Sequence, residues 1–121
     1  MQYFLETISH STTGVKTRTP GFPVVGYKIT IGSKNGGPNY VVRSEGSCDG
    51  TLQVCHTSYV DASRALMDAP YNDRVAFVKE WNGAAYVTKV HATHDSLTAT
   101  EIKYNVVTAD ANYQFKIEAW G

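Results

Sequence analysis

Residues 24–31 read Val-Val-Gly-Tyr-Lys-Ile-Thr-Ile, and this stretch decides the fold class. Large apolar side chains fall at every second position from Val25 to Ile31. Because successive side chains of a strand point to opposite faces, this alternation predicts a half-buried β-strand. An Asn-Gly-Gly sequence lies in the next segment, 34–39, and predicts a tight turn into an antiparallel return strand at 40–44.

The composition extends this interpretation to the whole chain of 121 residues. It holds 13 Val, 5 Ile and 13 Thr beside 8 Tyr, but only 4 Leu. Branching at Cβ and aromatic rings favour a pleated sheet over a helix. We therefore expect a mainly β protein, a single domain over 1–121, built as an antiparallel sandwich or barrel of about eight strands. Further strands are expected at 2–8, 51–57, 74–79, 85–93, 97–107 and 113–120.

One segment, residues 61–69, carries the signals of a helix. Asp61 can cap its first turn, and Pro70 ends it because proline disfavours helical geometry in the residue before it. A helix this short must pack on the sheet to be stable.

The charge balance excludes some partner classes. Lys and Arg number 11, as do Asp and Glu, so the formal net charge is zero. Nucleic-acid grooves and anionic membrane surfaces normally require a basic excess, so we expect neither partner. No apolar run is long enough to span a membrane and residues 2–6 do not resemble a signal peptide, which leaves the cellular location open.

Cys48 and Cys55 flank an Asp49-Gly50 turn and are the candidate disulfide. Antiparallel strands could bring them into range, and two reduced thiols are the alternative. Two cysteines do not complete a zinc site, and His56 points to the opposite face of the strand from Cys55. We therefore expect no metal and no other cofactor.

Residues 89–96 are the densest in reactive side chains. On a strand His91 and Asp95 share a face, and His94 lies on the other. A carboxylate beside an imidazole is the usual arrangement of a general base. The alternative is a solvated strand end followed by a turn.

The sequence Asn-Asp-Arg-Val-Ala-Phe at 72–77, followed by His91 or His94, resembles part of the small secreted microbial ribonucleases. The resemblance implies that Arg74 binds the scissile phosphate and that one of the two histidines is the general acid. It covers residues 72–94 only. Residues 51–70 contain no counterpart of the family's catalytic glutamate, and acid–base cleavage needs both partners.

Aromatic residues beside polar loops favour a binding function. Trp81 precedes Asn82-Gly83, and a two-residue hairpin there would place alanine opposite the indole and leave its faces open. Sugar rings stack their C–H faces on such aromatic planes, while amides and carboxylates bind their hydroxyls. The alternative is a tryptophan that closes the core. The predicted ligand-binding residues are Trp81, Asn82, Tyr86, His91 and Asp95.

We therefore expect a non-catalytic, lectin-like module that binds a glycan or another small molecule. A small hydrolase or ribonuclease using Arg74 with His91 or His94 is the enzyme alternative. A self-assembling subunit is the third hypothesis, because the strand at 113–120 is expected to be an unprotected sheet edge able to form a homo-oligomer. Trp120 is expected in the core.

Overall fold

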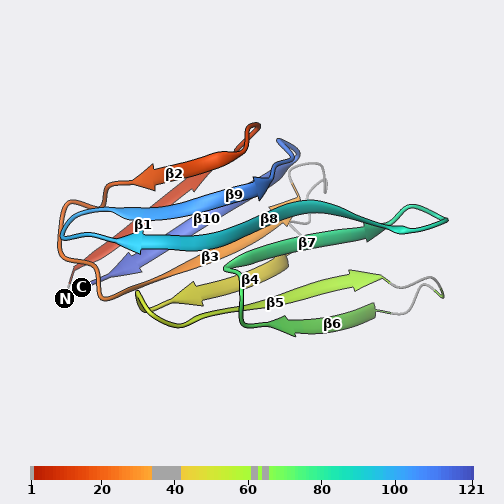
Figure 1. Ribbon diagram of the computed structural model, residues 1–121, viewed down its shortest axis with the longest axis horizontal. Helices are drawn as coiled ribbons and strands as arrows, with labels where there is room; N and C mark the ends of the chain where they lie inside the picture. The colour runs from red at the N-terminus through yellow and green to blue at the C-terminus, as the bar shows by residue number, and fades with distance from the viewer. Residues whose placement is uncertain (1, 34–41, 61–62, 64–65) are drawn as a thin grey trace.

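The computed structural model describes residues 2–33, 42–60, 63 and 66–121, which form ten β-strands (Figure 1). In chain order they are β1 (Tyr3–Ile8), β2 (Gly14–Arg18), β3 (Gly26–Ser33), β4 (Val42–Cys48), β5 (Gln53–Val60), β6 (Leu66–Tyr71), β7 (Ala76–Trp81), β8 (Tyr86–Leu97), β9 (Ile102–Thr108) and β10 (Tyr113–Trp120). Within this part of the chain no helix is long and apolar enough to cross a membrane.

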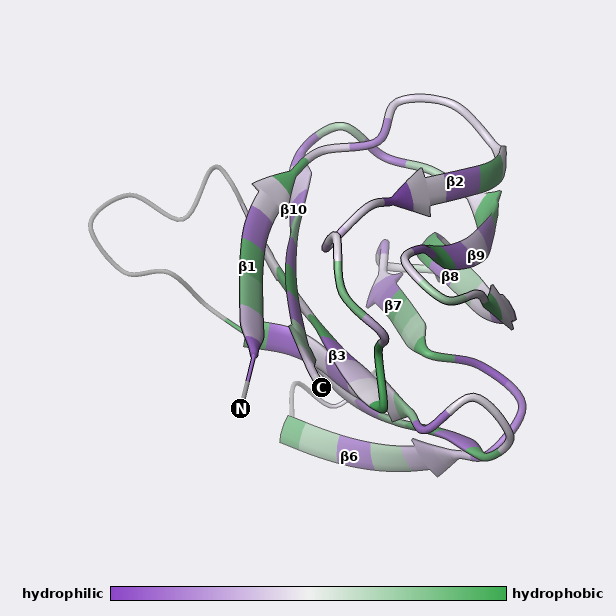
Figure 2. Ribbon diagram, turned by 90° about the vertical axis from the view of Figure 1, so that its left-hand side faces the viewer, coloured by the Kyte–Doolittle hydropathy of each residue, from purple (hydrophilic) through white to green (hydrophobic). Residues whose placement is uncertain are grey.

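The strands form two antiparallel sheets. One has six strands in the order β1-β10-β3-β4-β5-β6, and the other has four in the order β2-β9-β8-β7. In Figure 2 the six-stranded sheet curves along one side of the molecule and the four-stranded sheet lies along the other. This is a β-sandwich, so the prediction of a mainly β, antiparallel fold is confirmed.

The hydrophobic core lies between the sheets and follows the strand alternation. On β10 every second residue is buried, from Tyr113 to Ala119, and the residues between them face outward. β9 alternates in the same way from Ile102 to Val106, whereas β3 is buried at all of its residues except Lys28 and Ser33. The largest fully buried side chains are Tyr27, Tyr104, Phe115, Ile29, Ile31, Ile102 and Ile117.

The stretch that predicted the fold is confirmed as a central strand. Tyr27, Ile29 and Ile31 are fully buried in β3, which pairs with β10 and β4. Val25 precedes the strand and is exposed, so the inward face begins at Tyr27. The predicted turn at 34–39 lies outside the described residues.

The helix predicted at 61–69 is wrong over its second half. Residues from Leu66 form strand β6, which pairs with β5 and is the edge of the six-stranded sheet. Pro70 fits there, because an edge strand tolerates the loss of one amide donor. Residues 61, 62, 64 and 65 lie outside the described residues.

The C-terminal strand is not a sheet edge. β10 lies between β1 and β3, with both of its sides hydrogen-bonded, so the predicted oligomer edge at 113–120 is wrong. The edges of the six-stranded sheet are β1 and β6.

Cys48 and Cys55 are both buried and unbridged. Cys48 pairs with Gln53, whereas Cys55 pairs with Gly46, so the two cysteines are offset by two residues along neighbouring strands. That offset separates their Cα atoms by roughly 8 Å, beyond the reach of a disulfide. The disulfide prediction is therefore wrong.

Candidate functional site

The β7–β8 hairpin positions the predicted tryptophan. Trp81 pairs with Tyr86, not with alanine, and residues 82–85 form the turn between them. The Asn82 N–H donates to the Ala85 carbonyl at 3.0 Å. The side-chain oxygen of Asn82 accepts hydrogen bonds from the backbone N–H groups of Ala84 and Ala85 at 2.9 and 2.8 Å. The turn has four residues, so the expected two-residue hairpin is wrong, and Asn82 stabilises the turn through its oxygen.

Four side chains from both sheets form what we call the hairpin cluster: Tyr59, Lys79, Trp81 and Tyr86. The rings of Trp81 and Tyr86 meet edge to face with centroids 5.0 Å apart. Tyr59, on β5 of the other sheet, meets Tyr86 in the same way at 5.5 Å. The indole of Trp81 therefore has an aromatic cross-strand neighbour, and Tyr86 remains 42% exposed.

The Lys79 ammonium lies within this cluster. Its Nζ atom is 4.1 Å from the Tyr59 ring centroid and 4.8 Å from that of Tyr86. Electron-rich ring faces attract a cation and hold it in place. None of the ion pairs between described residues involves Lys79, so its positive charge has no carboxylate partner in that part of the chain.

Sequence reasoning found Trp81 and Tyr86 but not the contact with Tyr59. Alternation along β7 could have placed Lys79 and Trp81 on one face. The contact with Tyr59 depends on how the two sheets pack, because β5 and β7 belong to different sheets. No local pattern carries that information.

A second group of side chains surrounds Arg74. Its guanidinium lies over the adjoining rings of Tyr71 and Phe77, at 4.3 and 4.4 Å from their centroids. Two of its nitrogens bind the Asp73 carboxylate at 2.7 and 3.0 Å. These hydrogen bonds lower the pKa of Asp73, so it remains a carboxylate at neutral pH.

The structure separates the two candidate histidines. His91 meets the Phe77 ring edge to face at 5.6 Å, so it belongs to the Arg74 group. Burial, and then the charge of Arg74, lower its pKa. His94, also on β8, instead contacts the six-stranded sheet: its Nδ1 and the hydroxyl of Tyr27 on β3 share a hydrogen bond of 2.6 Å. Of the two, His91 is the one placed with Arg74.

Asp95 is not part of either group. A β-bulge between His94 and Ser96 interrupts the alternation of β8 at this residue, and Asp95 is exposed there. Its carboxylate accepts a hydrogen bond from the Ser96 hydroxyl at 3.1 Å. The predicted ligand-binding residues are thus not brought together. Trp81 and Asn82 end β7 and begin the turn, and Tyr86, His91 and Asp95 lie at the start, in the middle and near the end of β8.

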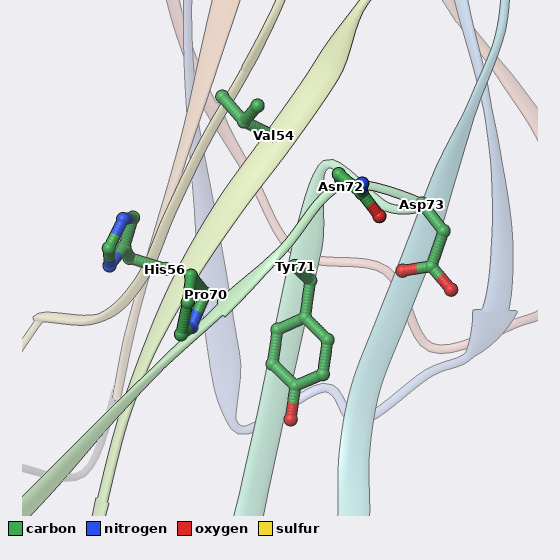
Figure 3. Close-up of a pocket in the computed structure, with 6 residues that line it drawn as sticks. All are labelled: Val54, His56, Pro70, Tyr71, Asn72 and Asp73. Atoms are coloured by element: carbon green, nitrogen blue, oxygen red, sulfur yellow. The ribbon is translucent and has the colours of Figure 1, made fainter.

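A depression of about 610 Å³ follows the sheet edge at β6 (Figure 3). His56 pairs with Pro70, and Tyr71 comes next, so His56 and Tyr71 project to opposite faces of the sheet. The polar groups therefore do not converge on one point. The lining residues are Val54, His56, Pro70, Tyr71, Asn72 and Asp73.

Among the described residues no three His, Cys, Asp or Glu side chains are grouped so that they could hold a metal ion. No protein-family model, curated protein or solved structure matches the chain.

Proposed function

We propose that this protein is a non-catalytic, carbohydrate-binding module whose ligand lies against the hairpin cluster. One observation carries the proposal. The Lys79 ammonium, which has no carboxylate partner in the described part of the chain, lies over two tyrosine rings from different sheets, and the Trp81 indole packs on one of those rings.

This combination matches the chemistry of a saccharide. The apolar C–H face of a sugar ring stacks on an aromatic plane, and polar groups at its edge bind hydroxyls. Lys79 supplies three N–H donors over the rings of Tyr59 and Tyr86. Its charge favours a sugar that carries a carboxylate or a sulfate.

The test is a glycan array on the wild-type protein and on Trp81→Ala, with melting curves for both. We expect the variant to lose glycan binding and only about 0.5–1.5 kcal/mol of stability, the contribution of one aromatic pair. Val87→Ala is the matched control, because Val87 lies next to Tyr86 on the opposite face of β8. A loss of about 3–5 kcal/mol, with no glycan bound by the wild type, would identify Trp81 as a core residue and overturn the proposal.

A second candidate function, acid–base cleavage of a phosphodiester, is favoured by one observation. Arg74 and His91, the two roles implied by the ribonuclease resemblance, both contact Phe77. This hypothesis predicts RNA cleavage that His91→Gln abolishes, with His94→Gln as the control. No cleavage by the wild-type protein between about pH 5 and 8, the range in which histidine titrates, would rule it out.

A further inference from the structure

Trp120 lies on the outer face of the six-stranded sheet, not in the core as the sequence predicts. On β10 the buried residues alternate with outward ones, and Trp120 belongs to the outward set. Its side chain is 36% exposed. A tryptophan is usually buried over most of its surface, so an indole exposed on an outer sheet face indicates a surface for binding a ligand.

Gly26 lets the indole lie flat on the sheet. Gly26 is the cross-strand partner of Trp120. A Cβ atom at Gly26 would lie 2.9, 3.1 and 3.2 Å from the indole atoms Cζ2, Cε2 and Nε1. Because three ring atoms lie at nearly equal distances, one face of the indole rests on this glycine. The other face is directed away from the sheet.

Tyr3 extends this surface across the neighbouring strand. It is the cross-strand partner of Trp120 on β1 and is 57% exposed. The Tyr3 hydroxyl donates a hydrogen bond of 2.6 Å to the Glu118 carboxylate. This hydrogen bond to Glu118 holds the Tyr3 ring beside the Trp120 indole.

Polar groups border the two rings. Glu118 is two residues from Trp120 and on the same face of β10. The cross-strand partner of Glu118 is Lys28 on β3. The hydrogen bond from Tyr3 lowers the pKa of Glu118, so the carboxylate stays ionised at neutral pH. The other oxygen of Glu118 lies 3.6 Å from the Lys116 ammonium, so the group offers both hydrogen-bond acceptors and donors to the hydroxyls of a sugar.

We propose that Tyr3, Trp120 and Gly26 form a second saccharide-binding site, in which a pyranose ring stacks on the outward face of the indole. Glu118 and Lys28 bind its hydroxyls. This site shares no residue with the hairpin cluster and lies at the opposite end of the sandwich, near the chain termini (Figure 1). A molecule with two sites at opposite ends would cross-link glycan chains.

The chain has two tryptophans, so each site can be followed separately. In Trp81→Phe the only indole is Trp120. We would titrate this variant with neutral oligosaccharides of glucose, N-acetylglucosamine, galactose and mannose while recording tryptophan emission. The expected result is a saturable emission change with at least one probe. No change with any of them overturns the second site.

Direct binding measurements on the full chain separate the two proposals. We expect Trp120→Ala to weaken binding at this site by about tenfold. Gly26→Ala should do the same, because its added Cβ displaces the indole, and Val15→Ala on the other sheet should have no effect. Loss of binding in Trp81→Ala alone overturns the second site, whereas loss in Trp120→Ala alone overturns the hairpin site. If Trp120→Ala does not fold, the emission titration of Trp81→Phe still shows whether a saccharide binds at Trp120.

Discussion

At the scale of single residues, Gly46 sets the distance between the two sheets where β4 passes β7. The backbone carbonyl of Val75 occupies the space that a Cβ atom on Gly46 would need. The glycine is therefore required by close packing and not by a special backbone angle.

We predict that Gly46→Ala destabilises the protein by about 3 kcal/mol or more, because a backbone segment must move to admit one methyl group. Urea unfolding measures this change. Ser47→Ala, on the next residue and the opposite face, is the control and should cost less than about 0.5 kcal/mol. Equal stabilities for the two variants would contradict the close packing of β4 against β7.

The residues of the candidate site show what a sequence can and cannot predict. The Trp81 and Tyr86 positions follow from a hairpin signal, Asn-Gly, that acts over a few residues. The flat indole of Trp120 depends on Gly26, which lies 94 positions away in the chain. Alternation alone could have placed Trp120 outward, since it falls out of step with Phe115 and Ile117 on the same strand.

At the scale of strands, the free edge of β7 is closed by side chains. The Phe77 N–H donates to the Ser44 hydroxyl at 3.1 Å, and the Thr57 hydroxyl donates to the Phe77 carbonyl. Both hydroxyls come from the inner face of the six-stranded sheet and are buried. They substitute for a neighbouring strand, which this edge of the four-stranded sheet lacks among the described residues.

We predict that Ser44→Ala and Thr57→Val each cost about 1–3 kcal/mol of stability, because each leaves a buried backbone group of Phe77 without its partner. Chemical denaturation provides the measurement. Ser58→Ala, whose hydroxyl binds Asp68 at the surface, is the control and should be nearly neutral. A neutral Ser44→Ala would show that another group satisfies the Phe77 amide.

The strands also show where local signals fail. Residues 66–69 belong to the segment that a capping Asp61 and a terminal Pro70 predict to be helical. The hydrogen bonds of β5 at the sheet edge outweigh this preference, since they satisfy the backbone of a segment too short to be a stable helix. β2 was not predicted at all, because its five residues lie between two turn-rich segments.

At the scale of the whole molecule, two histidine–tyrosine hydrogen bonds connect separate parts of the sandwich. His94 on β8 and Tyr27 on β3 join the two sheets. His10, in the connection from β1 to β2, shares a hydrogen bond of 2.7 Å with Tyr104 on β9 and packs on Phe115 of β10. Burial lowers the pKa of each histidine below its ordinary value, so both are neutral at pH 7.

The free energy of unfolding should therefore fall on acidification. The pKa of His10 is lowered to about 4 by burial, and then by the charges of Lys16 and Arg18. In the unfolded chain a histidine titrates near 6.5, so between these values the unfolded state binds more protons. The contribution is complete above about pH 6.5 and is lost as the pH falls toward 4.

We predict a loss of about 2–3 kcal/mol between pH 7 and pH 4 from His10 alone. Urea unfolding across this range should show a weaker pH dependence in His10→Gln than in the wild type. The carboxylates of Asp95 and Asp49 raise the pKa of His94, so His94 contributes less to the pH dependence of stability. The same pH dependence in both proteins would contradict the assignment to His10.

The central claim, a glycan site at the hairpin cluster, is tested most directly by an amide and side-chain NMR titration. The probe is the best-bound saccharide from the array, added to the isotopically labelled wild-type protein. The account predicts that Tyr59, Lys79, Trp81 and Tyr86 shift together and saturate with one dissociation constant. Saturable shifts confined to other residues, with these four unchanged, would contradict it.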